Sequence, residues 1–497
     1  MKIKFIFPKG QSHNFWDLKF SAKLSGKKYS GIPLSLPTLA GLTPRDIDVE
    51  IIDENIEPID FNDKVDLVGI SYFTAFSNRA YEIADEFKNR GIKVVLGGIH
   101  ASALHGEALK HADSVIIGEA EGSWNILLED FRNKNLKSIY YKKDEIDIAT
   151  SPIPRWDLVN LDYYNFFSIQ ATRGCPFDCE FCSVKSFFGK NFRFKPIDNV
   201  INEVRYLQNL NKKTGIVLAD DNILISKQYT KELIKALIHL GVKHWWCQSS
   251  IDIANHDDIL QLMSESGCTQ IFIGLESVSQ ESLNSMNKGR TNKASDYLSA
   301  INKIHSYGIS VFGSFILGGD GDSEDIFKKT VEFITEANIA FALIGILVPF
   351  PGTRLFERFK SENRLLHENW NLYNGETVCF KPKLMTAKTL QEGHRWVLEK
   401  LYSYEALSKR LDSLWKKGVL TKQGGIINKY LDLTKVFFAL KGSISSIRDI
   451  NRINFLLKSL YNPHNPRFFS ILSAIDFHDV VLEYLNTIGN LNDKNYS

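Results

Sequence analysis

Residues 172–184 read TRGCPFDCEFCSV and place three of the six cysteines of the chain, Cys175, Cys179 and Cys182, within eight positions. Three thiolates on one short loop suit a cuboidal iron-sulfur cluster, because the loop can curl around one corner while each sulfur binds a different iron. The motif has no fourth cysteine, so one iron would stay open to a ligand that is not protein. The spacing therefore predicts a catalytic cluster rather than an electron relay closed by four thiolates.

A zinc site is the alternative for clustered cysteines. Zinc prefers four tetrahedral protein ligands, usually as two pairs, and the chain has no second C-x2-C pair and no H-x3-H pair. The other cysteines, Cys247, Cys268 and Cys379, lie among apolar runs and are interpreted as small buried hydrophobes. The sequence thus favours one iron-sulfur cluster and no second one.

Composition narrows the classes of protein that remain. The chain has 497 residues, of which 44% are hydrophobic, so two or three globular domains are expected. Its 60 basic and 58 acidic residues give a net charge of +2, which predicts no nucleic-acid partner. The start, MKIKFIFPKG, is too short for a secretory signal and is predicted as a first strand. No apolar run is long enough to span a membrane, so we expect a cytoplasmic protein.

Residues 1–140 alternate short apolar runs with amphipathic segments such as NRAYEIADEFKNRG. The runs are β-branched and apolar on both faces, which predicts a doubly wound parallel sheet. Ligands of such sheets bind beyond the carboxyl ends of the strands. Ordinary strand-to-helix turns remain the alternative reading of these ends. Residues suited to a ligand there, by close backbone approach or by a hydroxyl, are Gly97, Gly98, Ser71, Thr74 and Ser77.

A charged stretch at residues 141–166 predicts a linker, and the alternation of strands and helices restarts at residue 167. About six βα units over residues 167–375 predict a parallel barrel, complete or partial. Polar residues at the strand ends would face the mouth of that barrel, where barrel chemistry is placed. The ones singled out are Asp220, Asp221, Gln248, Glu276 and Ser277.

The motif C-x3-C-x-aromatic-C after the first barrel strand resembles the signature of radical S-adenosylmethionine (SAM) enzymes. The first 135 or so residues look like the cobalamin-binding domain of the largest subclass, with GISYFTAFS, LGGIHAS and IIGEAEGSW matching its loops. Further along, LADDN, IFIGLESVSQESLNSMNKGR, FILGGDGDSEDIF and VPFPGTRLF follow the subclass pattern. The segment FKPKLMTAKTLQEGHRWVLEKLY resembles the C-terminal extension of hopanoid C-2 methylases. The resemblance covers nearly the whole chain.

This resemblance implies three cofactors: a [4Fe-4S] cluster on Cys175, Cys179 and Cys182, SAM on its open iron, and cobalamin. In methylating members a 5'-deoxyadenosyl radical removes hydrogen from an unactivated carbon, and methylcobalamin delivers the methyl group. We therefore expect methylation of an apolar small molecule, such as a lipid, a tetrapyrrole or a natural product, with flavodoxin or ferredoxin as the reductant. The alternatives are cyclisation or oxidative rearrangement on the same scaffold, and a non-catalytic cobalamin- or tetrapyrrole-binding protein.

Site residues follow from the resemblance only at matching positions. The chain lacks the D-x-H-x-x-G loop whose histidine binds cobalt in other cobalamin proteins, so no lower ligand of that kind is expected. His100 is interpreted as a loop or tail-pocket residue rather than a cobalt ligand. The expected cofactor contacts are Phe181, Asp220, Asp221, Gln248 and Glu276 for the cluster and SAM, and Ser71, Thr74, Gly97, Gly98, His100, Gly118 and Glu119 for cobalamin.

Residues 376–497 have helical apolar spacing and are predicted to form a mainly helical C-terminal domain. From Lys409 to Arg467 basic residues outnumber acidic ones. Such a face could contact an anionic membrane, and a helical cap on the barrel with a solvated basic side is the alternative. The last residues, NLNDKNYS, are predicted to be disordered.

Overall fold

The computed structural model describes residues 1–10, 22, 27–211 and 215–419. The described residues fall into two compact units. The first unit holds those within Met1–Asn14, Gly31–Ile225 and Val348–Lys381, and the second holds those within Phe15–Ser30, Ser226–Leu347 and Pro382–Ser497. The domain boundaries expected after residues 140, 166 and 375 remain predictions.

The first unit contains a parallel sheet, as the apolar runs predict. Its strands are rich in buried apolar residues, and Ile3, Leu67 and Val94 are fully buried. The strand order, β2-β1-β3-β4-β5-β6, reverses direction between β1 and β3. The strands are β1 (Lys2–Phe7), β2 (Asp48–Asp53), β3 (Leu67–Ser71), β4 (Lys93–Gly97), β5 (Ser114–Ile117) and β6 (Ile139–Tyr141).

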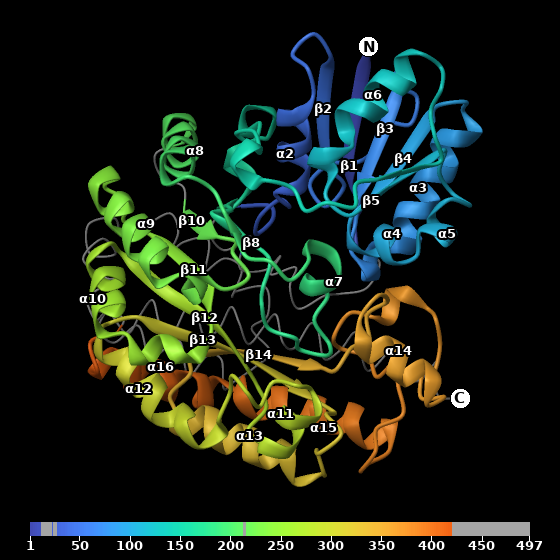
Figure 1. The fold of residues 1–497 in the computed structure, drawn as a ribbon. Coiled ribbons are helices and arrows are strands. Elements are labelled where there is room, and N and C mark those ends of the chain that lie inside the picture. The colour runs from blue at the N-terminus through green and yellow to red at the C-terminus, as the bar shows by residue number, and fades with distance from the viewer. Residues whose placement is uncertain (11–21, 23–26, 212–214, 420–497) are drawn as a thin grey trace, which may run out of the picture. The chain divides into compact units, whose positions relative to one another are not determined.

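Helices cover both faces of this sheet (Figure 1), which makes it doubly wound. The helices α2 (Ser35–Leu42) and α6 (Trp124–Arg132) pack against each other, and the buried indole N–H of Trp124 donates to the Thr43 hydroxyl at 2.9 Å. The other face carries α3 (Ser77–Asn89), α4 (Ile99–Ala103) and α5 (His105–Ala108). The helix α3 is amphipathic and turns Ala80, Ile83, Ala84 and Phe87 toward the sheet.

The first unit continues into the segment that carries the cysteine motif. Strand β7 (Phe166–Ile169) pairs in parallel with β10 (Gly215–Leu218), and α8 (Ile197–Leu210) connects them. Between β7 and α8, the short strands β8 (Thr172–Arg173) and β9 (Arg193–Phe194) pair antiparallel. The cysteine loop and helix α7 (Val184–Phe188) lie between these two short strands in the sequence.

The second unit continues the predicted alternation of strands and helices. Its four parallel strands have the order β14-β13-β12-β11. Figure 1 shows the helices α9, α10, α12 and α13 along one face of these strands. The elements are α9 (Lys227–Leu240), β11 (Trp245–Ser249), α10 (Asp257–Glu265), β12 (Cys268–Glu276), α11 (Gln280–Ser285), α12 (Tyr297–Ser306), β13 (Ser310–Leu317), α13 (Asp325–Glu336) and β14 (Phe341–Ile346).

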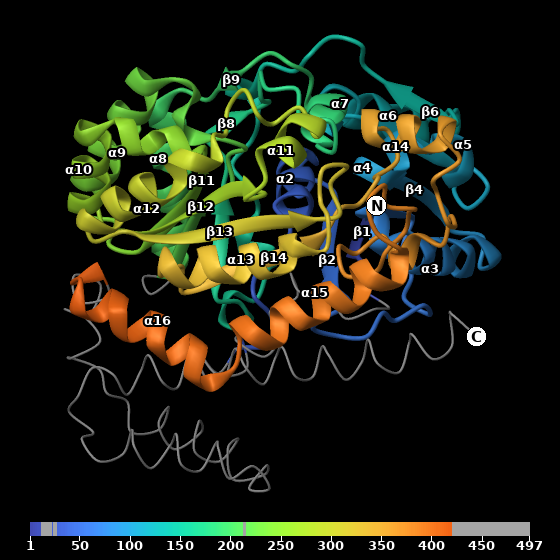
Figure 2. The same ribbon diagram turned by 90° about the horizontal axis from the view of Figure 1, so that it is seen from below.

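In the described part of the C-terminal region, which ends at residue 419, the helices are α15 (Ala387–Leu401) and α16 (Tyr404–Lys416). Figure 2 shows α15 running beside α13 and β14. Side chains fix this contact, because the buried His394 ring bonds to the Ile344 backbone oxygen at 2.9 Å and the Tyr402 hydroxyl accepts from the Ala342 N–H at 2.9 Å. Most of the basic stretch and the predicted disordered tail lie outside the described residues. No helix in the described ranges is long and apolar enough to cross a membrane.

The connection from β14 to α15 belongs to the first unit rather than to the second. Residues 348–381 include α14 (Arg354–Ser361) and form an apolar cluster of Val348, Phe356, Trp370, Tyr373 and Cys379. The Trp370 indole N–H donates to the Glu107 carboxylate at 3.0 Å. This segment therefore packs on the helices that follow β4 in the first sheet.

Candidate functional site

The cysteine motif forms a loop between β8 and α7. Gly174 opens the loop with φ at 89°, and a Cβ at this position would lie 2.4 Å from the Asn191 backbone oxygen. A close approach in this left-handed conformation requires glycine. The Cys182 N–H donates to the Cys179 carbonyl oxygen at 3.2 Å, so the loop turns between its second and third cysteines. Phe181 is half-buried inside this turn.

The donor set of the loop fits an iron-sulfur cluster. Its three cysteines are half-buried, and the six cysteines of the chain, all of them described, form no disulfide. Burial is the main cause that raises the pKa of the Cys182 thiol to about 12, and the nearby Cys179 and Cys175 contribute to the same shift. Among the described residues, no three Cys, His, Asp or Glu side chains converge on a single metal ion. A cluster needs no such convergence, because each thiolate binds a different iron.

Two carboxyl groups after β10 support the strand that leads into this loop. Asp220 accepts hydrogen bonds from the N–H and the hydroxyl of Thr172, and Asp221 accepts one from the Gly174 N–H at 3.2 Å. Burial raises the pKa of Asp220 to about 7 and that of Asp221 to about 6. The second carboxyl oxygen of Asp220 is buried without a hydrogen-bond partner in the described part of the chain. Both predicted residues therefore lie beside the cysteine loop.

A buried ion network joins the same strand to the loop after β5. Arg173, which precedes Gly174, pairs with Glu119 and also with Glu121 at 2.9 Å. Arg193 of β9 pairs with the second oxygen of Glu119 at 2.8 Å and donates to the Phe188 backbone oxygen at 2.8 Å. Charges removed from water persist when they are paired in this way. The network links the GEAEGS loop of the first sheet to the beginning and the end of the cysteine segment.

A pocket of 560 Å³ lies within the first unit, a volume typical of small-molecule sites. Its wall combines the segments after β4 and β5, the stretch after β6, helix α7 and the turn before α14. Gly118, with φ at 76°, and Glu119 belong to this wall, and their contact with cobalamin stays a prediction. A Cβ added at Gly118 would meet no atom within 4 Å. Other residues of the wall are Ile99, Ser102, Ala103, Tyr141, Phe187, Phe188 and Gly352.

The remaining predicted residues of the first sheet lie at its carboxyl end. Ser71 ends β3, where the strand order reverses, and its hydroxyl donates to the Ser35 hydroxyl at 3.3 Å. Gly97 has open space at its Cβ position, whereas a Cβ at Gly98 would lie 2.6 Å from the Tyr72 backbone oxygen. Thr74 follows in a buried turn.

His100 lies in the interior rather than in the pocket wall. Its side chain is fully buried, with ring contacts to Trp370 at 5.3 Å and to Tyr72 at 5.9 Å. Its Nε2 atom lies 3.6 Å from the Glu107 carboxylate. The expected contact of His100 with cobalamin, and its interpretation as a loop or tail-pocket residue, stay predictions.

Gln248 and Glu276 belong to the second unit. Gln248 lies on β11 beside Phe272 of β12. Glu276 ends β12 with φ at 65°, a conformation that is costly for a residue other than glycine and that concentrates at functional sites. Burial raises the pKa of its carboxyl group, and Lys288 pairs with it at 3.5 Å. Just before it, the Leu275 backbone oxygen accepts from the Tyr297 hydroxyl at 2.6 Å.

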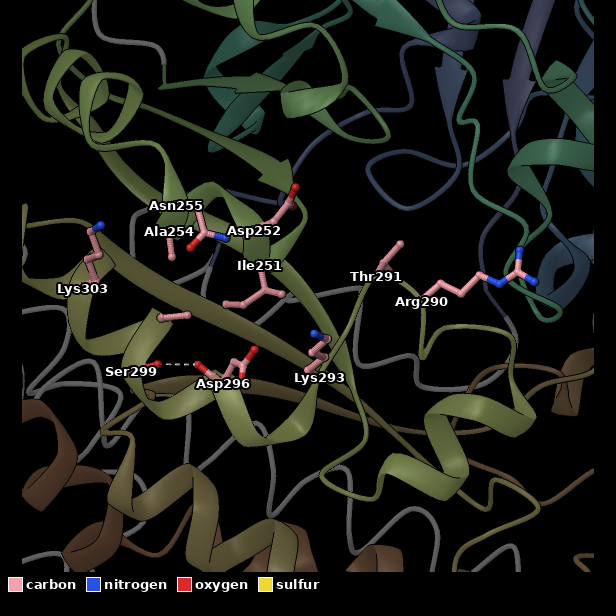
Figure 3. Close-up of a pocket in the computed structure, with 11 residues that line it drawn as sticks. Ile251, Asp252, Ala254, Asn255, Arg290, Thr291, Lys293, Asp296, Ser299 and Lys303 are labelled. Atoms are coloured by element: carbon pink, nitrogen blue, oxygen red, sulfur yellow. Dashed lines mark hydrogen bonds between the residues drawn. The ribbon is translucent and has the colours of Figure 1, made fainter.

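A second pocket, of 420 Å³, lies in the second unit between the turn after β11 and the residues around the start of α12. Figure 3 shows Arg290 pointing away from Asp252 and Asn255, while Lys303 lies on the opposite side of the pocket. Lys303 is also paired with Asp257 at 3.0 Å. The charges of this pocket therefore do not converge on one point.

Residues that hold the two loops to each other were not predicted from the sequence. Arg173 lies directly before Gly174 of the cysteine loop, and Glu121 lies in the GEAEGS loop, but neither was assigned a role. Their partners are distant in sequence, since Arg173 and Glu119 are separated by 54 positions. The sequence did contain a signal for this network: Arg173 lies next to the cysteine motif, and Glu119 and Glu121 lie close together in the GEAEGS loop.

Three known families match successive parts of the chain. Residues 169–334 match the radical SAM superfamily, residues 27–128 match the B12 binding domain, and residues 353–465 match a domain of unknown function (DUF4070).

Among curated relatives, the bacteriochlorophyllide d C-12(1)-methyltransferase of Chlorobaculum tepidum is 34% identical over 76% of this chain and 84% of its own length. The hopanoid C-2 methylase of Rhodopseudomonas palustris is 27% identical over 76% of this chain and 73% of its own.

Solved structures share the fold. The cobalamin-dependent SAM radical enzyme OxsB, with aqua-cobalamin bound, superposes with a TM-score of 0.63 over 99% of this chain and 80% of its own, at 14% identity. The radical SAM methyltransferase TsrM of Kitasatospora setae, with cobalamin and a [4Fe-4S] cluster, gives 0.57 over 73% of this chain and 78% of its own, at 16% identity. The predicted layout of a doubly wound domain followed by a partial barrel is therefore confirmed.

Proposed function

The chain belongs to the cobalamin-dependent radical SAM enzymes and is a methyltransferase of that family, and we propose that it methylates an unactivated carbon of an apolar small molecule. Its cofactors are a [4Fe-4S] cluster, SAM and cobalamin. The observation that carries the proposal is the 560 Å³ pocket of the first unit. One wall comes from the loops after β4 and β5, and another comes from α7, which begins two residues after Cys182.

The cluster and cobalamin each have residues in the first unit that suit them. Cys175, Cys179 and Cys182 would hold the cluster, and Gly118 and Glu119 would line the cobalamin site. When bound, the cluster and SAM supply radical hydrogen abstraction, and cobalamin carries the methyl group. In the second unit, Gln248 and the strained Glu276 remain our candidates for polar contacts with SAM.

The residues of the chain orient these groups and exclude water. Phe181 within the cysteine loop, together with Phe187 and Phe188 of α7, would keep the reaction space apolar. Arg173 holds the Glu119 loop to the segment that enters the cysteine loop, so the two binding loops are fixed relative to each other. A rigid frame of this kind keeps the reacting atoms at the separation that transfer requires.

Tetrapyrroles are the first substrate class to test and polycyclic lipids the second. Support for this order comes from the relatives, because those named for bacteriochlorophyllide methylation share more identity with this chain than the hopanoid methylase does. We further propose that flavodoxin or ferredoxin supplies the electron and that the protein is cytoplasmic. A peripheral membrane contact of the basic C-terminal stretch is proposed from its composition alone.

The test is anaerobic reconstitution with iron, sulfide, hydroxocobalamin, reductant and methyl-deuterated SAM, with each candidate substrate in turn. Mass spectrometry should detect a product that carries the deuterated methyl group, together with 5'-deoxyadenosine and S-adenosylhomocysteine. The control is Cys179→Ala, which should form none of the three. Substrate-dependent 5'-deoxyadenosine without methyl transfer would contradict methylation and favour the cyclisation alternative, a reaction for which the relative of Cereibacter sphaeroides is named.

A further inference from the structure

Two acidic residues flank the middle cysteine of the loop, Asp178 before Cys179 and Glu180 after it. Carboxylates beside an iron-sulfur cluster oppose its reduction, because reduction adds negative charge to a group that thiolates already make anionic. Both acidic residues contact α14, a helix that follows the loop by more than 170 positions.

The contact with Glu180 is a two-point charged pair. The Arg358 Nε atom donates to one carboxylate oxygen at 2.6 Å and its Nη2 atom to the other at 2.8 Å. The Glu180 backbone oxygen also accepts from the Leu355 N–H at 3.0 Å. The side chains are 26% and 14% exposed, so the pair is largely shielded from water. Bidentate pairs of this kind fix geometry as well as charge.

A second contact lies one helical turn earlier. Arg354 donates to the Asp178 backbone oxygen at 2.7 Å and lies 3.2 Å from its carboxylate, which Lys185 also approaches at 2.6 Å. Because residues four apart share a helix face, Arg354 and Arg358 meet the loop side by side. The Arg354 pair is more exposed and contributes less.

The helix α14 is itself firmly placed. The Thr353 hydroxyl caps its first turn by accepting from the Phe356 N–H at 3.2 Å. It buries Leu355, Phe356 and Phe359, and Phe356 belongs to the apolar cluster of residues 348–381. Figure 2 shows α14 beside α7, the helix that follows the cysteine loop.

We propose that α14 is the clamp of the cluster loop, with Arg358 as a positioning residue that holds Glu180, and through it Cys179, while its guanidinium offsets the adjacent carboxylate. The helix lies outside the radical SAM match and at the start of the match to a domain of unknown function, residues 353–465. The proposal thus gives that domain a role. It rests on the three cysteines being the cluster ligands.

The first experiment measures the midpoint potential of the cluster in the reconstituted full chain, by reductive titration followed by electron paramagnetic resonance. Arg358→Gln should shift the potential in the negative direction, because a cation is lost. Glu180→Gln should shift it in the positive direction, because an anion is lost. The double variant should return close to the wild-type value. If the Arg358–Glu180 pair had only a structural role, the midpoint potentials of both single variants would shift in the same direction. That result would overturn the proposal.

The second experiment needs no cluster. In the full chain without iron, the alkylation rate of Cys179 is followed by peptide mass spectrometry. Arg358→Gln should raise this rate about tenfold, the factor that corresponds to about 1.4 kcal/mol of lost restraint. Cys268, which is buried at the start of β12 in the second unit, serves as the internal reference. Equal rates in the variant and the wild type would overturn the clamp. Arg358→Lys keeps the charge without the fork, so it should leave the potential near wild type with an intermediate rate. If Arg358→Gln does not fold, Arg358→Lys replaces it in this experiment.

The matched control is Arg79→Gln. Arg79 of α3 pairs with Glu54 through the same kind of two-point contact. The side chains of Arg79 and Glu54 are 27% and 11% exposed, close to the values for Arg358 and Glu180. Neither readout should change. Cys179→Ala separates the two proposals: a cluster that survives in this variant refutes the ligand assignment. A cluster that is lost there, with unchanged Arg358 variants, refutes the clamp alone.

Discussion

Arg173 forms a buried ion pair with Glu119, and this pair connects the segment that enters the cysteine loop with the wall of the 560 Å³ pocket. Both side chains are 8% exposed, and Glu121 and Arg193 complete the network around them. The loops expected to hold two different cofactors are therefore joined directly by charge within the first unit.

Replacing Arg173 with methionine should destabilise the fold, because Glu121 loses its cation and Glu119 keeps only Arg193. Breaking a buried pair costs on the order of 3 kcal/mol in the free energy of unfolding. Urea denaturation of the full chain measures this cost. The comparison is Arg132→Met, which breaks an exposed pair with Asp46 and should cost less than about 1 kcal/mol. Similar losses in both variants would contradict the buried network.

Gly118→Leu should abolish most cobalamin binding, because the new side chain would enter the pocket. A leucine in the left-handed conformation also costs about 1–2 kcal/mol of stability. Gly91→Leu controls for this strain, since Gly91 has φ at 77°, equally open surroundings and no part in the pocket wall. Absorbance titration with hydroxocobalamin should give at least about tenfold weaker binding for the first variant only. Equal affinity in both variants would place cobalamin elsewhere.

Asp220 should make stability depend on pH. Burial raises its pKa to about 7, whereas the unfolded chain has the ordinary value near 4. The folded state therefore favours the protonated carboxyl, and its stabilising contribution is complete below about pH 4 and is lost as the pH rises through about 7.

The variant Asp220→Asn removes this titration. Relative to wild type, it should gain up to about 4 kcal/mol between pH 4 and 7, at about 1.4 kcal/mol for each pKa unit. Denaturation of the iron-free chain at several pH values measures the difference. A difference that does not change with pH would refute the raised pKa.

Cys179→Ala should lose the iron and the visible absorption of the cluster, since two thiolates cannot replace three. Cys268→Ala is the control, because Cys268 is buried at the start of β12 in the second unit. This control should keep its iron and lose about 1 kcal/mol of stability through the small cavity. Iron analysis after anaerobic reconstitution decides between these outcomes. Retained iron in the first variant would refute the assignment.

Local patterns were sufficient for the two sheets. The start of the chain was predicted as a first strand, and its residues KIKFIF form β1. The cysteine motif was found because its ligands are adjacent in sequence. Gly118 and Glu119 were predicted because they follow a strand in a loop that resembles the cobalamin-binding pattern, and the structure places them in the wall of the 560 Å³ pocket.

Pairs that are distant in sequence were not predictable in this way. Arg358 and Glu180 are 178 positions apart, and Trp370 and Glu107 are 263 apart. Charged residues on an amphipathic helix such as α14 look like ordinary solvated positions. Their partners are known only once the chain after β14 is seen to pack in the first unit.

That packing has a consequence for anyone who dissects or recombines this protein. The cobalamin-binding part is completed by a late stretch of the chain, because Trp370 covers His100 and bonds to Glu107. A fragment ending near residue 140 would leave these groups uncovered. Chimeras that exchange the first 140 residues between relatives should therefore carry residues 348–381 from the same parent.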